Sequence, residues 1–123
     1  MDQASPLAAR VAAYFEMWNE TDAAARRELV EEVWTADALS VDPIAEVSGR
    51  TAIDGHVAAV QQQYPGYRIV QNGDVDAHHD RARFPWVMRD GTGQAVLTGI
   101  DSVRLAADGR FAELVGYFDP TPA

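Results

Sequence analysis

The spacing of apolar residues in this 123-residue chain changes once, near Pro65, from a helical period to a strand period. Before Pro65, apolar residues recur every three or four positions, as on a helix that buries one face. After it they alternate with polar residues, as on strands that are buried on one side. Helices followed by strands that short turns connect are typical of an α+β fold. We therefore expect one domain over residues 1–123, with helices covering one face of a mostly antiparallel sheet.

The three expected helices are located by their caps. Residues 6–19 form the first, which begins with a serine cap and a proline in the first turn. A second begins at the threonine or aspartate of residues 21–22. A third covers about residues 51–62, where Thr51 and Asp54 resemble a capping box. Strands are expected at residues 38–42, 44–47, 67–73, 81–89, 94–106 and 110–118.

Asp101 is the most informative single residue, because it interrupts an apolar strand face. Every second residue from Ala95 to Leu105 lies on one face, and Asp101 is the ionisable residue in that row. A carboxyl group on an apolar face loses hydration, which disfavours its charged form and raises its pKa. A neutral acid of this kind can donate a hydrogen bond inside an apolar site. The alternative is a structural hydrogen bond to Tyr14, to a tryptophan or to the backbone.

Composition excludes several partners and kinds of chemistry. The net charge of −9 argues against nucleic acid or an anionic membrane as a partner. All ten basic residues are arginine and cysteine is absent, which excludes a lysine Schiff base, a catalytic thiolate and disulfides. The sequence has no phosphate-binding loop, nucleophile elbow or dinucleotide fingerprint, so no cofactor is expected. Without a secretory signal or an apolar run of about 18 residues, the chain is expected to be cytoplasmic.

Several short strings carry a resemblance to a known superfamily. They are Val11-Ala12-Ala13-Tyr14, Asn19 with Asp22, Val41-Asp42-Pro43, Gly49-Arg50-Thr51-Ala52-Ile53, Gly99-Ile100-Asp101 and Asp108-Gly109-Arg110. Together with the order of helices and strands, they resemble the nuclear transport factor 2-like superfamily, which includes SnoaL-like and ketosteroid isomerase-like domains. The resemblance covers nearly the whole chain. It implies a cone-shaped, curved sheet wrapped around the N-terminal helices, with an apolar pocket inside.

By this resemblance three polar residues match catalytic positions of the ketosteroid isomerase branch. They are a tyrosine in the first helix, Tyr14, an aspartate just before a proline, Asp42, and an aspartate on a late strand, Asp101. The implied base is Asp42, while Tyr14 and Asp101 would hold the developing enolate oxygen. Structural roles are the alternatives. Tyr14 can be a core residue, and Asp42 can end a strand through ordinary turn chemistry.

Five further residues are expected to line the pocket. They are Trp18, His56, Trp86, Met88 and Phe118. His56 flanks the apolar stripe of the third helix, so it is either a second base or ligand contact, or a boundary histidine bonded to a neighbour. The adjacent His78 and His79 lie in a polar turn without selective ligand spacing, so no metal site is expected.

Two classes of function remain open. One is a small-molecule isomerase or cyclase that transfers a proton at carbon in an apolar pocket, or a related enzyme whose aspartates activate water. The other is a binding module for an apolar metabolite, or a domain that acts mainly by dimerising. In either class the ligand would be small and apolar or cyclic.

The outer face of the sheet is expected to contact a second copy of the chain. This face is predicted to carry Val87, Val96, Ile100, Val115 and Tyr117. Such a face is too apolar for full exposure, which favours a homodimer. The alternative is that these are scattered surface hydrophobic residues, which are common in monomers.

Overall fold

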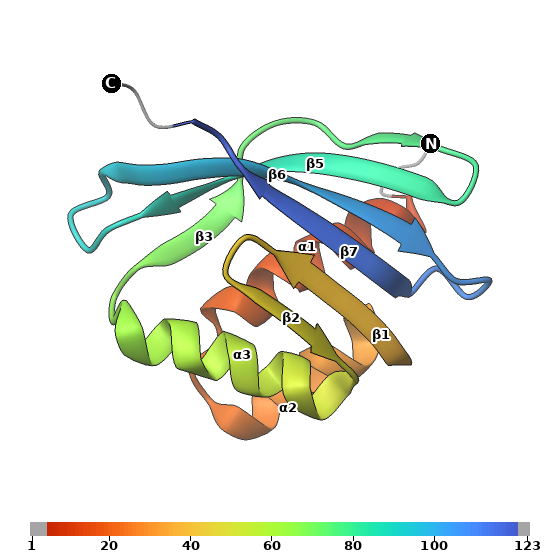
Figure 1. Cartoon of the computed structure of the whole chain (residues 1–123), viewed down its shortest axis with the longest axis horizontal. Coiled ribbons are helices and arrows are strands. Elements are labelled where there is room, and N and C mark those ends of the chain that lie inside the picture. The colour runs from red at the N-terminus through yellow and green to blue at the C-terminus, as the bar shows by residue number, and fades with distance from the viewer. Residues whose placement is uncertain (1–4, 121–123) are drawn as a thin grey trace.

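The computed structural model describes residues 5–120, and in that range the chain forms three helices and a seven-stranded sheet (Figure 1). The elements are α1 (Pro6–Asn19), α2 (Ala23–Val33), β1 (Trp34–Asp42), β2 (Ala45–Ser48), α3 (Arg50–Gln63), β3 (Arg68–Gln71), β4 (Asp76–His78), β5 (Arg81–Arg89), β6 (Ala95–Leu105) and β7 (Phe111–Phe118). The strand order is β2-β1-β7-β6-β5-β3, with β4 also paired to β5. β1 and β7 are parallel, and the other described pairs are antiparallel. The predicted α+β fold, with a curved and mostly antiparallel sheet around the helices, is confirmed, and the structure adds that the sheet does not close.

The curvature of the sheet creates the space for a site. β5, β6 and β7 pass over α1, while β1 and β2 bend toward α3 and contact it (Figure 1). All three helices therefore lie on the inner side of the sheet. No described helix is long and apolar enough to cross a membrane.

Side-chain caps fix the start of two helices. Ser5 and Asp22 accept hydrogen bonds from the third backbone N–H of α1 and α2, at 3.0 and 2.9 Å. The capping box predicted for the third helix is wrong, because α3 begins after Gly49 without a side-chain cap. Asp54 instead accepts a hydrogen bond from the buried Arg26 at 2.7 Å, which ties α3 to α2.

Two strand predictions need correction. β1 begins at Trp34, directly after α2, and not at Ala38, because its first residue pairs with Phe111 of the neighbouring parallel strand. β4 lies where a turn was expected, and it pairs with the first residues of β5.

The core is organised around the ring of Tyr14. This ring contacts Phe15, Trp34, Phe84 and Phe111 with centroids 5.2–6.0 Å apart, mostly in edge-to-face geometry. Such aromatic pairs each contribute about 0.5–1.5 kcal/mol beyond the burial of their area. The phenol ring is thus held from several sides, which fixes the position of its hydroxyl group.

The apolar residues predicted for the outer face of the sheet differ in how exposed they are. Tyr117 and Val96 are 57% and 44% exposed, and Ile100 and Val115 are partly exposed. Val87, however, is only 2% exposed within the single chain. Val87 alternates with the cavity-lining Trp86 and Met88 and so lies on the outer face as predicted, but it adds nothing to the accessible surface there.

Candidate functional site

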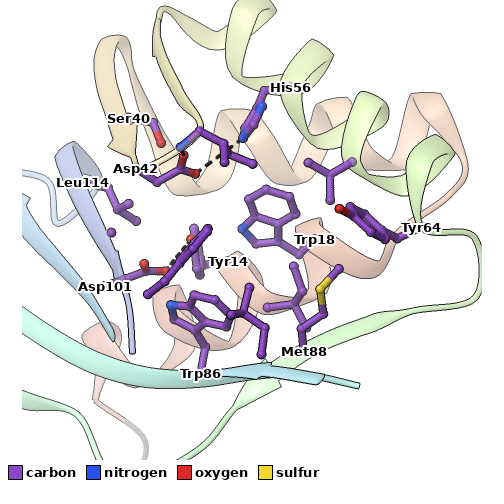
Figure 2. A pocket seen from close by; sticks show the side chains of 16 residues that line it. Tyr14, Trp18, Ser40, Asp42, His56, Tyr64, Trp86, Met88, Asp101 and Leu114 are labelled. Atoms are coloured by element: carbon purple, nitrogen blue, oxygen red, sulfur yellow. Dashed lines mark hydrogen bonds and ion pairs between the residues drawn. The ribbon is translucent and has the colours of Figure 1, made fainter. Parts of the chain in front are cut away.

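A cavity of about 160 Å³ lies between the inner face of the sheet and helices α1 and α3 (Figure 2). Its wall includes the eight residues that the sequence singled out, namely Tyr14, Trp18, Asp42, His56, Trp86, Met88, Asp101 and Phe118. They come from two helices and four strands, so their convergence depends on the whole fold. Their roles in binding or catalysis stay predictions.

Tyr14 and Asp101 form a buried polar pair in this cavity. The Tyr14 hydroxyl donates a hydrogen bond to Asp101 Oδ2 at 2.7 Å, and the two residues are 4% and 6% exposed. Burial raises the pKa of Asp101 to about 6, although the hydrogen bond from Tyr14 and the nearby indole N–H group of Trp86 both lower it. The negative charge of Asp42 adds to the increase. Asp101 therefore keeps its proton at pH values where a solvated aspartate is ionised.

Tyr14 remains neutral across the physiological pH range. Burial raises its pKa well above the ordinary value, and the charge of Asp101 and the hydrogen bond to it add to this effect. The indole of Trp18 acts in the opposite direction, and the charge of Asp42 raises the pKa further. The hydroxyl group is consequently a hydrogen-bond donor whenever the protein is folded.

Asp42 and His56 form a second polar pair on another part of the wall (Figure 2). Asp42 Oδ1 accepts hydrogen bonds from the backbone N–H groups of Ile44 and Ala45, each at 2.9 Å, which closes the turn between β1 and β2. Asp42 Oδ2 lies 3.6 Å from His56 Nε2. Partial burial favours a higher pKa for Asp42, but His56 and the two amides outweigh it, so the pKa lies below the ordinary value. Asp42 therefore takes part in the turn and also presents an ionised oxygen near the cavity.

The absence of a side chain at Gly116 leaves room for Asp42 and Asp101. A Cβ at this position would stand 2.7 Å from Asp101 Oδ1 and 3.4 Å from Asp42 Cβ. Gly116 pairs with Asp101 across β6 and β7, and Val115 pairs with Val41 across β7 and β1. The two acids thus flank one backbone position. Gly116 was not predicted from the sequence, although a glycine inside a strand often marks a close approach.

The remaining cavity residues were also missed. They are Ser40, Ile44, Val60, Tyr64, Ile69, Leu97 and Leu114. Most are apolar, and apolar pocket residues have the same sequence pattern as core residues. Two of these residues could have been predicted from strand alternation, because Leu97 lies on the same strand face as Asp101, and Ser40 lies on the same face as Asp42.

The paired histidines of the β4–β5 turn are remote from this cavity. His78 and His79 are exposed, with ring nitrogens 3.1 Å apart, and neither lines the cavity wall. In the part of the chain that the structure describes, no group of three or more His, Cys, Asp or Glu side chains is arranged to hold a metal ion.

Comparison with known proteins identifies relatives of the whole domain. The model of the SnoaL-like domain family matches residues 11–114. A solved structure of a proposed isomerase of the SnoaL-like family from Agrobacterium tumefaciens is 35% identical, with a TM-score of 0.87, over 91% of this chain and 96% of that chain. No curated protein matches the chain at a significant level.

More distant structures share the fold alone. A protein of unknown function from Exiguobacterium, described as nuclear transport factor 2-like, is 23% identical, with a TM-score of 0.73, over 91% of this chain and 99% of that chain. A proposed SnoaL-like polyketide cyclase from Jannaschia is 19% identical, with a TM-score of 0.70, over 97% of this chain and 92% of that chain. The family match over most of the chain, the relative from Agrobacterium tumefaciens and the curved sheet lead to one conclusion: the chain belongs to the SnoaL-like domain family.

Proposed function

We propose that this protein is an isomerase or cyclase that transfers a proton at a carbon next to a carbonyl group. One observation carries the proposal: Asp42 and Asp101 line one cavity, flank Gly116, and have pKa values shifted in opposite directions. Two carboxyl groups whose pKa values differ in this way can take different roles, one as an ionised base and the other as a neutral hydrogen-bond donor. The SnoaL-like family match and its proposed isomerase relative support the reaction class.

The chemistry uses the two polar pairs in sequence. Asp42 Oδ2 removes a proton from the carbon, and the electron pair moves onto the carbonyl oxygen to form an enolate. The Tyr14 hydroxyl turns its hydrogen from Asp101 Oδ2 to that oxygen, and the neutral Asp101 carboxyl donates a second hydrogen bond to it. In an isomerase, Asp42 then returns the proton to another carbon. In a cyclase, the enolate carbon attacks a second carbonyl group, and the new alkoxide takes the proton from Asp42.

His56 is proposed to position the base and to share its proton. Its Nε2 atom is buried and makes no hydrogen bond among the described residues, and it lies 3.6 Å from Asp42 Oδ2. A small movement would bring the two atoms within hydrogen-bond distance. A histidine at this place can stabilise the ionised Asp42 or accept the proton that Asp42 has taken.

The size of the cavity limits the ligand. A cavity of about 150 Å³ holds one benzene molecule, and the volume here is about 160 Å³. The reacting part of the ligand is therefore about one six-membered ring in size. Ile44 and Tyr64, which are 67% and 38% exposed, also line the cavity, so a longer ligand would extend past them into solvent.

Deuterium exchange at carbon tests the proposal without requiring the natural substrate. Cyclohexanone and its β,γ-unsaturated analogue are incubated with the protein in D₂O, and loss of the protons next to the carbonyl is followed by NMR. We expect exchange above the buffer rate, reduced about 100-fold or more in Asp42→Asn, because proton transfer by a positioned base contributes 10²–10⁴-fold. Asp37→Asn, which changes an exposed acid on the same strand, should leave the rate unchanged.

The pH dependence of the exchange rate provides a second check. Exchange should decrease above about pH 6, where Asp101 loses its proton, and Asp101→Asn should remove that decrease. Full activity in Asp42→Asn would contradict the assignment of the base. Binding of the ketones without any exchange would indicate a binding module in place of an enzyme.

We also propose that two copies associate through the outer face of the sheet. The accessible apolar residues there are Val96, Ile100, Val115 and Tyr117. They lie on β6 and β7, which are neighbours in the sheet, and Ile100 pairs directly with Tyr117. Two copies of one patch related by a two-fold axis bury it on both sides.

A further inference from the structure

The indole N–H group of Trp86 is buried without a hydrogen-bond partner. Trp86 is 7% exposed, and its Nε1 atom has no acceptor among the described residues. The other tryptophan of the core differs, because the N–H group of Trp34 donates to Met17 Sδ at 3.3 Å. An unpaired buried donor costs about 1–3 kcal/mol, and a phenylalanine would fill the same wall without this cost. The N–H group of Trp86 therefore requires an explanation.

The sheet is built to hold this indole in one orientation. Trp86 pairs with Gly99 across β5 and β6, and a Cβ on Gly99 would collide with the Tyr117 carbonyl oxygen and with Trp86 Cζ2, and would stand 2.7 Å from Trp86 Cε2. Any residue other than glycine would displace the half of the ring that adjoins Nε1. Phe118 packs against the indole in edge-to-face geometry, with centroids 5.8 Å apart.

The N–H group lies at the end of the cavity that Tyr14 and Asp101 occupy. Phe84 pairs with Asp101, so Trp86 and Asp101 are diagonal neighbours on the same face of the sheet. Figure 2 shows the nitrogen of Trp86 on the side of Asp101. Asp101 Oδ2 already accepts the hydrogen bond from Tyr14, and Oδ1 lies against Gly116. The indole is close enough to lower the pKa of Asp101, but its N–H group makes no hydrogen bond of ordinary geometry with that carboxyl group.

We propose that the Trp86 N–H group is a third hydrogen-bond donor to the ligand oxygen, beside Tyr14 and Asp101. The ligand that satisfies it is a single-ring compound with a carbonyl or ionised oxygen directed at this end of the cavity. The inference rests on the proposed function in one respect, that a ligand oxygen is held by Tyr14 and Asp101. It does not depend on proton transfer.

The indole proton signals report directly on this hydrogen bond. The chain has three tryptophans, so a ¹⁵N-labelled sample gives three indole N–H signals, which Trp→Phe variants assign. Para-nitrophenol serves as the probe, because it is one ring with an oxygen that ionises near neutral pH. On its addition, the Trp86 proton should move downfield as it gains an oxygen acceptor. The Trp34 signal is the internal control, because that N–H group is already bonded in the core.

Comparison of two probes separates the contribution of the Trp86 N–H group to binding from the contribution of the ring's shape. Trp86→Phe should weaken binding of para-nitrophenol by about tenfold or more, since a hydrogen bond to a charged group contributes about 1.5–3 kcal/mol. Nitrobenzene has the same ring without the phenol oxygen, so its affinity should change much less. Equal losses for both probes would mean that Trp86 contributes only shape, and would overturn the inference.

The measurement on the unaltered protein does not depend on the folding of any variant. Absence of para-nitrophenol binding, or binding that leaves the Trp86 signal unmoved, would overturn the inference. Failure of the proposed function has a different signature. If Trp86 responds to para-nitrophenol but ketones undergo no exchange, the donor assignment stands and proton transfer is wrong.

Discussion

At the scale of single residues, two opposing effects determine the pKa of Asp101. Its burial disfavours the charged form, and its hydrogen bond with Tyr14 favours that form. Burial dominates, so the pKa rises from 3.8 to about 6. A group with a raised pKa in the folded state binds its proton more tightly when folded. Asp101 therefore lowers the free energy of unfolding increasingly as pH rises from 3.8 to about 6, and the full decrease is present above about pH 6.

Asp101→Asn should remove this pH-dependent cost. The amide cannot ionise, and its oxygen can still accept the Tyr14 hydrogen bond. The variant should exceed the unaltered protein in free energy of unfolding by a margin that grows by about 1–2 kcal/mol between pH 5 and pH 8. Urea denaturation at several pH values measures this margin. Asp37→Asn, at an exposed site, provides the control, and a margin independent of pH would contradict the raised pKa.

The sequence revealed Asp101 because strand alternation is local information. One carboxyl among apolar residues in steps of two is visible without knowledge of the fold. The unpaired indole of Trp86 and the contact of Asp42 with His56 were not visible. Both depend on distances between residues far apart in the chain, which no spacing rule supplies.

At the scale of elements, β7 determines how closely the acids approach. It pairs with β6 on one side and, in parallel, with β1 on the other. Gly116 lies at the point where these two strands place Asp101 and Asp42. The parallel pairing was not predicted, because nothing in either strand indicates the direction of its partner. For the same reason the first residues of β1 were not recognised as a strand.

Gly116→Ala should disturb the site more than the fold. The added methyl group would stand 2.7 Å from Asp101 Oδ1, so the carboxyl must move away from Tyr14 or the strands must separate. Overpacking of this kind costs about 1–3 kcal/mol of stability. Binding of para-nitrophenol and the free energy of unfolding should both decrease. Gly91→Ala, at a turn position with no atom nearby, should leave both unchanged, and an unaltered probe affinity in Gly116→Ala would contradict the crowding.

At the scale of the whole molecule, one face of the sheet encloses the cavity and the other is open to a partner. The order of helices and strands apart from β4, the cap of α1 and the convergence of the predicted pocket residues on one cavity followed from the sequence, because apolar periodicity and family resemblance both indicate them. The accessible area of the outer face could not be predicted from the sequence. Val87 alternates like its neighbours on that face but is buried, and burial depends on how other segments cross the sheet.

Association through the outer face can be tested by mass. Light scattering at micromolar concentration should give a dimer for the unaltered chain and a monomer for Tyr117→Glu, because a buried, unpaired carboxylate opposes association. Tyr67→Glu changes a second exposed tyrosine, outside that face, and should leave the dimer intact. A monomeric mass for the unaltered chain would contradict the proposed dimer.

The packing of the Tyr14 ring among aromatic side chains of the core limits which substitutions this position accepts. The cavity-facing hydroxyl group and the core-packing ring belong to one side chain, so Tyr14 cannot be replaced by a residue of another shape without repacking the domain. Exposed positions at the entrance of the cavity, such as Ile44, are not packed into the core in this way. Substitutions at the entrance should therefore change which ligands bind at a smaller cost in stability than substitutions of Tyr14.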